Sequence, residues 1–296
     1  MSEDIVVSSP TRLFLSGTEG IARGGPAILT ALSWRVVVSV IRKGKGMTVI
    51  PPAFTQDTEK ILDAVKKAYK LHTIPPLEVN VSFSVPGDRF GVHTAFTVAA
   101  VGAIAYALKG LWNPPFIHQI AYELEKRHHP FADAESAIST YGGYLWYRQE
   151  LPFLKSIWQL PIRPKPELVH LWCVDTKTGG KPIQKKSDVM RSEFEEQTRR
   201  VTTALKEGDV EAFTAALQHE EQLLERAGAV EREMTAYIRA IERSGGAAKA
   251  VGESTVLCWH PQEERLNELS QRFHLTIRKV SIGEEGIRLE RGRGDS

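Results

Sequence analysis

The sequence lacks the features that mark secreted, metal-clustering and nucleic-acid-binding proteins. Only two cysteines, Cys173 and Cys258, occur in 296 residues, and their wide separation predicts neither a disulfide framework nor a cysteine metal motif. The formal net charge is only +2, which gives no reason to expect nucleic-acid binding. The opening MSEDIVVSS has neither the basic end nor the apolar core of a secretory signal. We therefore expect a soluble cytoplasmic protein with no nucleic-acid partner.

Long uncharged apolar runs are also scarce. The best candidate follows His93 but meets Lys109, which is early for a membrane span, so we expect no membrane partner. Residues 94–108 contain no proline and one glycine, and are mostly Ala, Val, Ile and Phe. A helix that is apolar on most sides is buried in a core. With 42% apolar and 25% charged residues, the chain suits one large or two ordinary globular domains.

Glycine is scarce in the loop that leads into this helix. Residues 86–91 (PGDRFG) are turn-rich and deliver the chain to the helix N-terminus. Unpaired backbone N–H groups and the helix dipole favour an anion at such a position. A tight phosphate cradle usually needs more glycines than this loop provides. From these residues alone, an ordinary loop before a core helix fits better than a phosphate loop.

Periodicity predicts mixed strands and helices. Alternating or β-branched apolar residues predict strands at 4–8, from about residue 12, and at 34–41, 77–85, within 139–147, at 168–174, 254–259 and 273–280. Helical spacing predicts helices at 55–71, 94–108, 116–129, 187–205, 209–226 and 231–243. Pro161, Pro164 and Pro166 punctuate the middle of the chain. We place a boundary there, with one α+β domain at 1–165 and a second at 166–296.

Carboxylates supply the main candidate chemistry. Asp133 and Glu135 stand two residues apart just before the turn-like STYGG segment, and an acid in such a loop could serve as a general base. Glu123 and Glu125 lie on the helix predicted at 116–129, and one of them could hold Mg²⁺, which prefers carboxylate and phosphate oxygens. A surface loop and a solvated helix face are the ordinary alternatives.

Two further segments have open interpretations. His128 and His129 are adjacent, and adjacent residues on a helix do not share a face, so a solvated helix end fits better than a metal site. The small-residue segment 245–252 (GGAAKAVG) permits either a tight turn or the close approach of a ligand to the backbone.

The order of these segments resembles the GHMP kinases, and within them the mevalonate kinase branch, over almost the whole chain. Residues 9–27 are similar to the opening motif APGKxxLxGEHxVxxGxPA, and 86–95 lie where the family has the phosphate loop PxxxGLGSSAA. The later matches are 121–126 with the helix carrying a magnesium-binding Glu, 129–143 with HGxPSGxDNxxSTxGG, and 174–179 with DTGxxxxT. STYGG, and the order EGD, LL, AG after residue 207, are fairly specific to the mevalonate kinase branch.

Several positions depart from the family pattern. Arg12 replaces the lysine of the opening motif, and Gly17-Thr-Glu19 replaces its GEH. The phosphate loop has lost most of its glycines and both serines, and His93 and Thr94 stand near their place. The C-terminal GAGGGGC segment reads GESTVLC at 252–258, where bulky side chains obstruct the approach of phosphate to the backbone.

The resemblance implies an α+β fold of two domains with the active cleft between them. It implies ATP-dependent phosphorylation of a small-molecule alcohol, with mevalonate, an isoprenoid precursor, as the first candidate, ATP and Mg²⁺ as cofactors, and a homodimer as one possible assembly. The implied roles are catalysis by Arg12 with Asp133 or Glu135, phosphate binding by Gly91, His93, Thr94 and Gly252, substrate binding by Glu19 and Thr176, and Mg²⁺ binding by Glu125 and Thr94.

A second interpretation comes from a different class. The lost glycines favour a GHMP-fold protein that no longer transfers phosphate from ATP. Such a protein would act as a binding or regulatory protein, or as a lyase or decarboxylase on a phosphorylated substrate. The retained Glu125, Thr94 and acidic segment favour the kinase.

The choice between the two acids depends on the local conformation. In an extended loop Asp133 and Glu135 would lie on the same side, roughly 6–7 Å apart, so only one could reach the substrate. We expect Asp133, because its shorter side chain loses less entropy when it is held in place.

Overall fold

The computed structural model describes residues 4–21, 24–44, 46–85, 90–127, 130–151, 154–175, 188–251 and 255–292. The chain divides into two compact units. Unit 1 comprises Met1–Leu13, Thr30–Gly143 and Glu284–Ser296, and unit 2 comprises Phe14–Leu29 and Tyr144–Gly283. The strands β1 (Asp4–Ser16) and β2 (Pro26–Ile41) contribute residues to both units.

This division differs from the single boundary expected after residue 165. The strand β11 (Arg288–Arg291) pairs antiparallel with β1 through Val6, Val7 and Ser8, so the C-terminal part of the chain returns to unit 1. The boundary was predicted from local proline content, which carries no information on the pairing of strands far apart in sequence.

The sheet of unit 1 has the strand order β11-β1-β2-β4-β3. The strand β4 (Leu77–Phe83) is antiparallel to β2 and parallel to β3 (Met47–Ile50), and its alternating burial confirms the predicted half-buried strand. The two strands expected near residues 4–8 and 12 form the single strand β1, which runs through Pro10. Proline has no N–H for a strand partner, and Pro10 lies beyond the stretch that pairs with β11.

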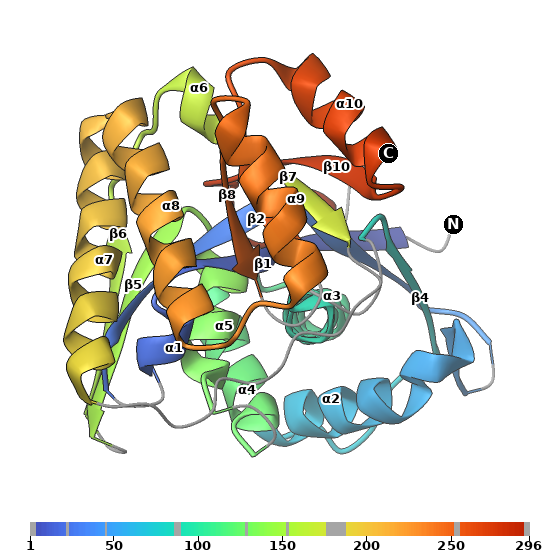
Figure 1. The fold of residues 1–296 in the computed structure, drawn as a ribbon. Helices are drawn as coiled ribbons and strands as arrows, with labels where there is room; N and C mark the ends of the chain where they lie inside the picture. Colours follow the sequence, from blue (N-terminus) through green and yellow to red (C-terminus); the bar gives the residue numbers. More distant parts are fainter. Residues whose placement is uncertain are drawn as a thin grey trace. The chain divides into compact units, whose positions relative to one another are not determined.

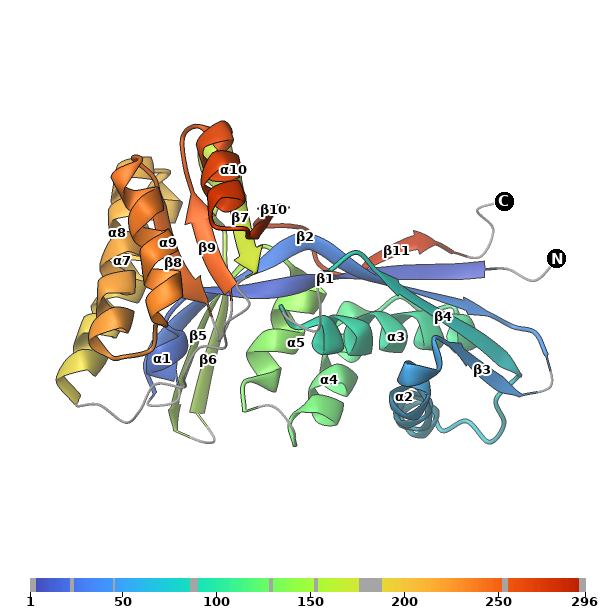
Figure 2. The same ribbon diagram turned by 45° about the vertical axis from the view of Figure 1, so that its right-hand side comes forward.

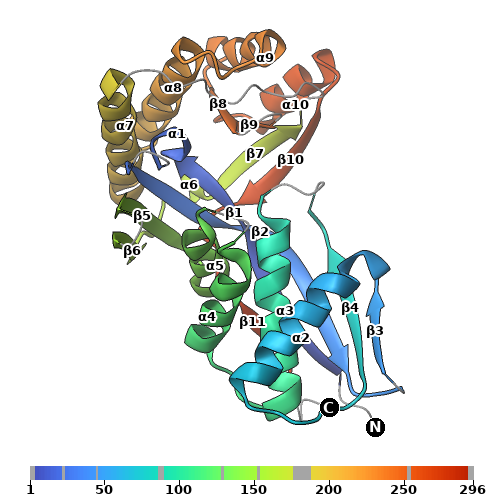
Figure 3. The ribbon, with the colours of Figure 1, turned by 90° about the horizontal axis from the view of Figure 1, so that it is seen from below.

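Helices cover one face of this sheet (Figure 2). They are α2 (Thr55–Ala68), α3 (Val92–Lys109), α4 (Pro114–Glu125) and α5 (Ala132–Tyr141). The helix α3 packs against each of the other three, as Figure 3 shows from below. By length and composition α3 could span a membrane, but 78% of that stretch is buried inside the protein. The prediction of a core helix at 94–108 is therefore confirmed.

Unit 2 contains a fully antiparallel sheet of order β10-β7-β9-β8. Its strands are β7 (His170–Asp175), β8 (Ala247–Val251), β9 (Thr255–Trp259) and β10 (Thr276–Ser281). The helices α7 (Asp188–Glu207), α8 (Val210–Arg226) and α9 (Arg232–Arg243) lie side by side (Figure 1), and α8 and α9 pack on β8. These helices confirm the predictions at 187–205, 209–226 and 231–243 to within a few residues.

Five further elements complete the described part of unit 2. They are α1 (Thr18–Ile21), β5 (Tyr144–Leu151), β6 (Leu154–Leu160), α6 (Pro166–Val169) and α10 (Glu263–Arg272), while the 3-10 turn Pro52–Phe54 belongs to unit 1. Two of the five, β5 and β6, extend the larger sheet through the pairing of β5 with β2. The segment 247–251, expected to be part of a loop, is the strand β8. The core of unit 2 is built by side chains such as Trp172, Leu223, Tyr237 and Ile238.

Candidate functional site

Three polar residues of unit 1 meet at the start of α3. Arg12 of β1 donates from Nη2 to Oε1 of Glu135, in the first turn of α5. Thr94 of α3 donates from Oγ1 to the second carboxylate oxygen of Glu135 at 3.4 Å. Glu135 is only 4% exposed, and a buried carboxylate is costly unless it is paired. The ion pair with Arg12 therefore compensates the burial of the Glu135 carboxylate beside the start of α3.

Gly91 fixes the position of Arg12. The backbone N–H of Arg12 donates to the carbonyl of Phe90 at 2.8 Å. Gly91 is the N-cap of α3 with φ of 71°, in the left-handed region, and a Cβ at this position would lie 2.9 Å from Cγ of Arg12. The Arg12 side chain thus crosses Gly91 in close contact. Its cationic end lies in the region where unpaired helix N–H groups favour an anion.

The two candidate acids point to different partners. They lie on a helix, not in the extended loop that we expected, and two helical positions differ by about 200° in direction. Glu135 turns to Arg12 and Thr94, whereas Oδ1 of Asp133 lies 3.6 Å from Nε2 of His118. The prediction of one face for both acids is wrong, because the extended conformation on which it depended is absent. The geometry supports Glu135, not Asp133, as the acid beside Arg12.

A second polar cluster forms around His93, the residue that precedes Thr94 on α3. Glu125, at the end of α4, is 2% exposed, and its Oε1 accepts from Thr97 Oγ1 at 2.5 Å. Nδ1 of His93 lies 3.1 Å from the same oxygen, and Nε2 of His93 lies 3.2 Å from Oδ2 of Asp57. Lys60 also contacts Asp57, at 2.9 Å. The hydrogen bond to Glu125 is the main cause that raises the pKa of His93 to about 9.

The expected magnesium ligands do not converge. Thr94 donates to Glu135, whereas the carboxylate of Glu125 contacts Thr97 and His93. Within the described part of the chain, no group of three or more His, Cys, Asp and Glu side chains is placed to hold a metal ion. The donor set of Glu125 and Thr94 therefore does not fit Mg²⁺.

Some predicted site residues lie outside the described structure. Gly252 and Thr176 fall in segments that the structure does not describe, as do His128, His129 and residues 86–89 of the loop before α3. Glu19 belongs to α1 in unit 2, and the orientation of its side chain is not described. The substrate-binding roles of Glu19 and Thr176 stay predictions.

Sequence reasoning missed two members of the second cluster. Thr97 stands four residues after His93 on α3, so helical spacing could have placed both near one neighbour. Asp57 comes from α2, 36 residues before His93. In the sequence, Asp57 looks like an ordinary acid in the first turn of a helix. Its favourable interaction with the helix dipole is enough to explain an acid at that position.

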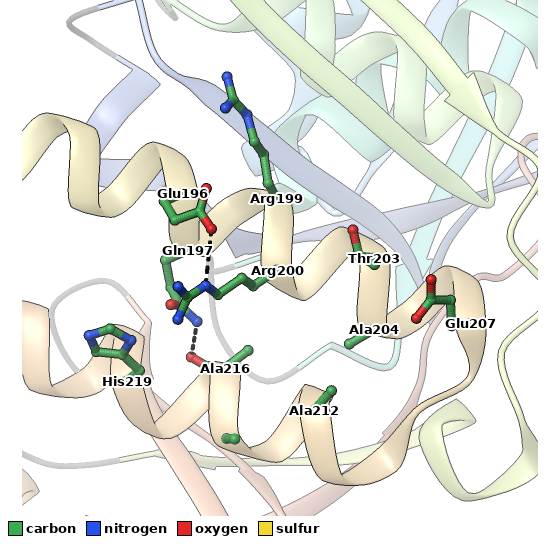
Figure 4. Close-up of a pocket in the computed structure, with 11 residues that line it drawn as sticks. Glu196, Gln197, Arg199, Arg200, Thr203, Ala204, Glu207, Ala212, Ala216 and His219 are labelled. Carbon is green, nitrogen blue, oxygen red and sulfur yellow. Dashed lines mark hydrogen bonds and ion pairs between the residues drawn. The ribbon is translucent and has the colours of Figure 1, made fainter.

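A groove of about 500 Å³ lies between α7 and α8 in unit 2 (Figure 4). Two of its charged groups pair with each other, since Nε of Arg200 lies 3.1 Å from Oε1 of Glu196. Gln197 donates to the carbonyl of Ala216 at 2.5 Å, and Arg199 points away from α8. The groove offers volume without a convergent reactive group, so the cluster at the start of α3 is the better candidate site.

Two mevalonate kinases are among the proteins that are similar to this chain in sequence. No protein-family model matches the chain. The mevalonate kinase of Methanothermobacter thermautotrophicus is 28% identical over 151 residues, which are 47% of this chain and 48% of that protein. The mevalonate kinase of Archaeoglobus fulgidus is 24% identical over 268 residues, which are 84% of this chain and 88% of that protein.

The structural comparison agrees with the sequence relatives. The crystal structure of the Methanococcus jannaschii mevalonate kinase matches 94% of this chain and 98% of that one with a TM-score of 0.72 and 14% identity. At this identity the likeness shows the fold alone. The expected α+β class is confirmed by it.

Proposed function

Given a chain with the GHMP kinase fold and mevalonate kinases as its sequence relatives, we propose that it transfers a phosphoryl group from ATP to a small-molecule alcohol. Mevalonate is the first candidate acceptor. The proposal includes action on a free metabolite in the cytoplasm, without a nucleic-acid or membrane partner.

One observation carries the proposal: Arg12, Thr94 and Glu135 meet at the N-terminus of α3. Phosphoryl transfer needs positioning and stabilisation of charge more than covalent help from the protein. The guanidinium of Arg12 is permanently charged and is a forked donor that suits phosphate oxygens. Glu135 is an ionised acceptor for the proton of the attacking alcohol.

The step follows from these roles. The alcohol oxygen attacks the γ-phosphorus, a new O–P bond forms, and the bond to the β-phosphate oxygen breaks, which releases ADP. The alcohol proton passes to a carboxylate oxygen of Glu135. Arg12 and the N–H groups at the start of α3 stabilise the charge on the transferred group. No step is assigned to a protein-bound metal, because Glu125 and Thr94 do not form a ligand pair.

A specific observation also favours the alternative function. The stem of Arg12 lies against Gly91, in the place where a phosphate would approach the helix backbone, and Glu125 is already paired with His93. Both features suit a protein that has kept the fold but binds a phosphorylated ligand without phosphoryl transfer from ATP, as a regulatory protein, a lyase or a decarboxylase.

Formation of phosphorylated product separates the two functions. The purified protein is incubated with ATP, Mg²⁺ and mevalonate or a panel of small alcohols, and the phosphorylated product is followed by phosphorus NMR. The kinase proposal predicts a new phosphomonoester signal together with ADP in equal amount. ADP release without a phosphomonoester, or no reaction with any alcohol, would favour the alternative.

A further inference from the structure

His93 is bridged by two carboxylates through its two ring nitrogens. Nδ1 lies 3.1 Å from Oε1 of Glu125 on α4, and Nε2 lies 3.2 Å from Oδ2 of Asp57 on α2. The ring is therefore held at both ends by acids from two different helices, in the first turn of α3. The expected magnesium ligand Glu125 is one of these acids.

With both carboxylates ionised, this geometry suits a charged ring. A neutral imidazole has one N–H and one nitrogen lone pair, and the lone pair would face a carboxylate oxygen. Only the doubly protonated imidazolium donates at both nitrogens. Glu125 is 2% exposed, and a carboxylate buried to this degree is retained where a cation and hydrogen bonds compensate it. His93 supplies the cation, and Thr97 supplies the further hydrogen bond.

The surroundings leave little place for a further cation such as a metal ion. The imidazolium and Lys60 face Asp57 and Glu125, so two cations balance two carboxylates. The cavity that these residues line with Thr97 holds about 40 Å³, which is room for very few water molecules. Mg²⁺ gives up its water reluctantly and usually keeps several water ligands. A hydrated Mg²⁺ would have to displace the His93 ring to reach Glu125.

We propose that the His93 imidazolium is a built-in cation that occupies the place of a divalent metal ion beside the start of α3, so that Glu125 and Asp57 hold no metal. The inference deepens the proposed function, because it concerns the phosphate-binding end of the same helix. It implies that the protein neutralises these two acids itself and that a phosphate binds there without a metal ion held by Glu125.

Manganese titration tests the inference directly. Free Mn²⁺, a stand-in for Mg²⁺, is followed by electron paramagnetic resonance in the absence of nucleotide, with wild type, Glu125→Gln, His93→Ala and the double variant His93→Ala/Glu125→Gln. We expect equal Mn²⁺ binding by wild type and Glu125→Gln. We expect His93→Ala to gain a site that is at least about tenfold tighter than in the double variant, because the charge count of the ligands sets the affinity.

Two results would overturn the inference. One is a Mn²⁺ site in wild type that Glu125→Gln removes, and the other is a folded His93→Ala protein that gains no site. Circular dichroism shows whether the variants fold. If His93→Ala does not fold, nitrogen NMR of the wild-type ring at pH 7 decides: two protonated nitrogens support the inference, and a neutral ring contradicts it.

The metal test and the kinase test can fail separately. The Mn²⁺ titration contains no nucleotide or alcohol, so it does not depend on phosphoryl transfer. Absence of a phosphorylated product would remove the proposed function and leave the His93 result unchanged. A manganese site at Glu125 in wild type would remove the inference and leave the kinase proposal intact.

Discussion

Arg12 and Glu135, 123 residues apart in sequence, form an ion pair that joins β1 to the first turn of α5. The side chain of Glu135 is 6% exposed and that of Arg12 is 19% exposed. The pair therefore lies mostly out of water, where a charge that loses its partner is strongly unfavourable.

Removal of Arg12 is expected to destabilise the fold more than removal of the whole pair. Arg12→Met leaves the carboxylate of Glu135 buried without its cation, and we expect a loss of about 2–4 kcal/mol, slightly below the range for fully buried pairs. The double variant Arg12→Met/Glu135→Gln should recover part of that loss. Urea unfolding of wild type, Arg12→Met, Glu135→Gln and the double variant gives the coupling energy. Additive effects of the two substitutions would show that the pair contributes nothing.

Alanine substitutions at Gly91 and at Gly44 form a matched pair that tests the close contact between Gly91 and Arg12 at the start of α3. Both glycines have positive φ, 71° and 94°, but a Cβ would meet Arg12 at Gly91 and would meet no atom within 4 Å at Gly44. Gly44→Ala should cost about 1–2 kcal/mol of backbone strain, and Gly91→Ala should cost more than that because of the added clash. Thermal unfolding compares them. Equal losses would contradict the close packing of Arg12 on Gly91.

His93 is expected to titrate well above an ordinary histidine. The contacts with Glu125 and Asp57 raise its pKa to about 9. The folded state then binds the proton more tightly than the unfolded state does, so the stabilisation is complete below pH 6.5 and is lost as the pH rises through 9. Proton NMR of the imidazole follows the titration, and Asp57→Asn should lower the pKa. A wild-type pKa near 6.5 would contradict the bridged geometry.

Glu221 should give a pH dependence of the same sign in unit 2, but over a lower pH range. This side chain is fully buried, its Oε2 accepts from the backbone N–H of Ala250 at 2.7 Å, and burial raises its pKa to about 7. Because the folded state disfavours the charged form, stability should fall by up to about 3 kcal/mol as the pH rises from about 4.5 to 7. Glu221→Gln keeps the hydrogen-bond acceptor and should remove this decrease. The free energy of unfolding is measured against pH for both proteins. If it changed with pH in the same way in wild type and in Glu221→Gln, the prediction would be contradicted.

The elements that could be predicted from sequence are those with dense apolar patterns. The middle of α3, from Val98 to Ala105, has no polar side chain, and α9 has apolar residues at regular helical spacing, so both were placed correctly. The helix α10 was missed because it buries only Leu266 and Ser270, which leaves almost no apolar periodicity to detect. The strand β1 can continue through Pro10 because the pairing with β11 ends before this residue, which has no N–H to donate. A sequence does not state where that pairing ends.

The site was predicted in part for a similar reason. Motif order pointed to Arg12, Thr94 and Glu135, which the structure brings together. The helix that carries Asp133 and Glu135 was not predicted, because the start of α5 has no side-chain cap. Phe131 occupies the N-cap position and makes no capping hydrogen bond, so the segment looked like a loop. The bridge from His93 to Asp57 joins two helices through charges that each look solvent-exposed in the sequence.

The most direct test of the central claim compares phosphoryl transfer by wild type, Glu135→Gln and Asp133→Asn. Transfer of the labelled γ-phosphoryl group from ATP to the alcohol is measured in a single turnover, and ATP affinity is measured by calorimetry. The account predicts transfer about 10²–10⁴-fold slower in Glu135→Gln, nearly unchanged ATP affinity, and a rate close to wild type in Asp133→Asn. Wild-type transfer by Glu135→Gln, or loss of transfer in Asp133→Asn alone, would contradict it.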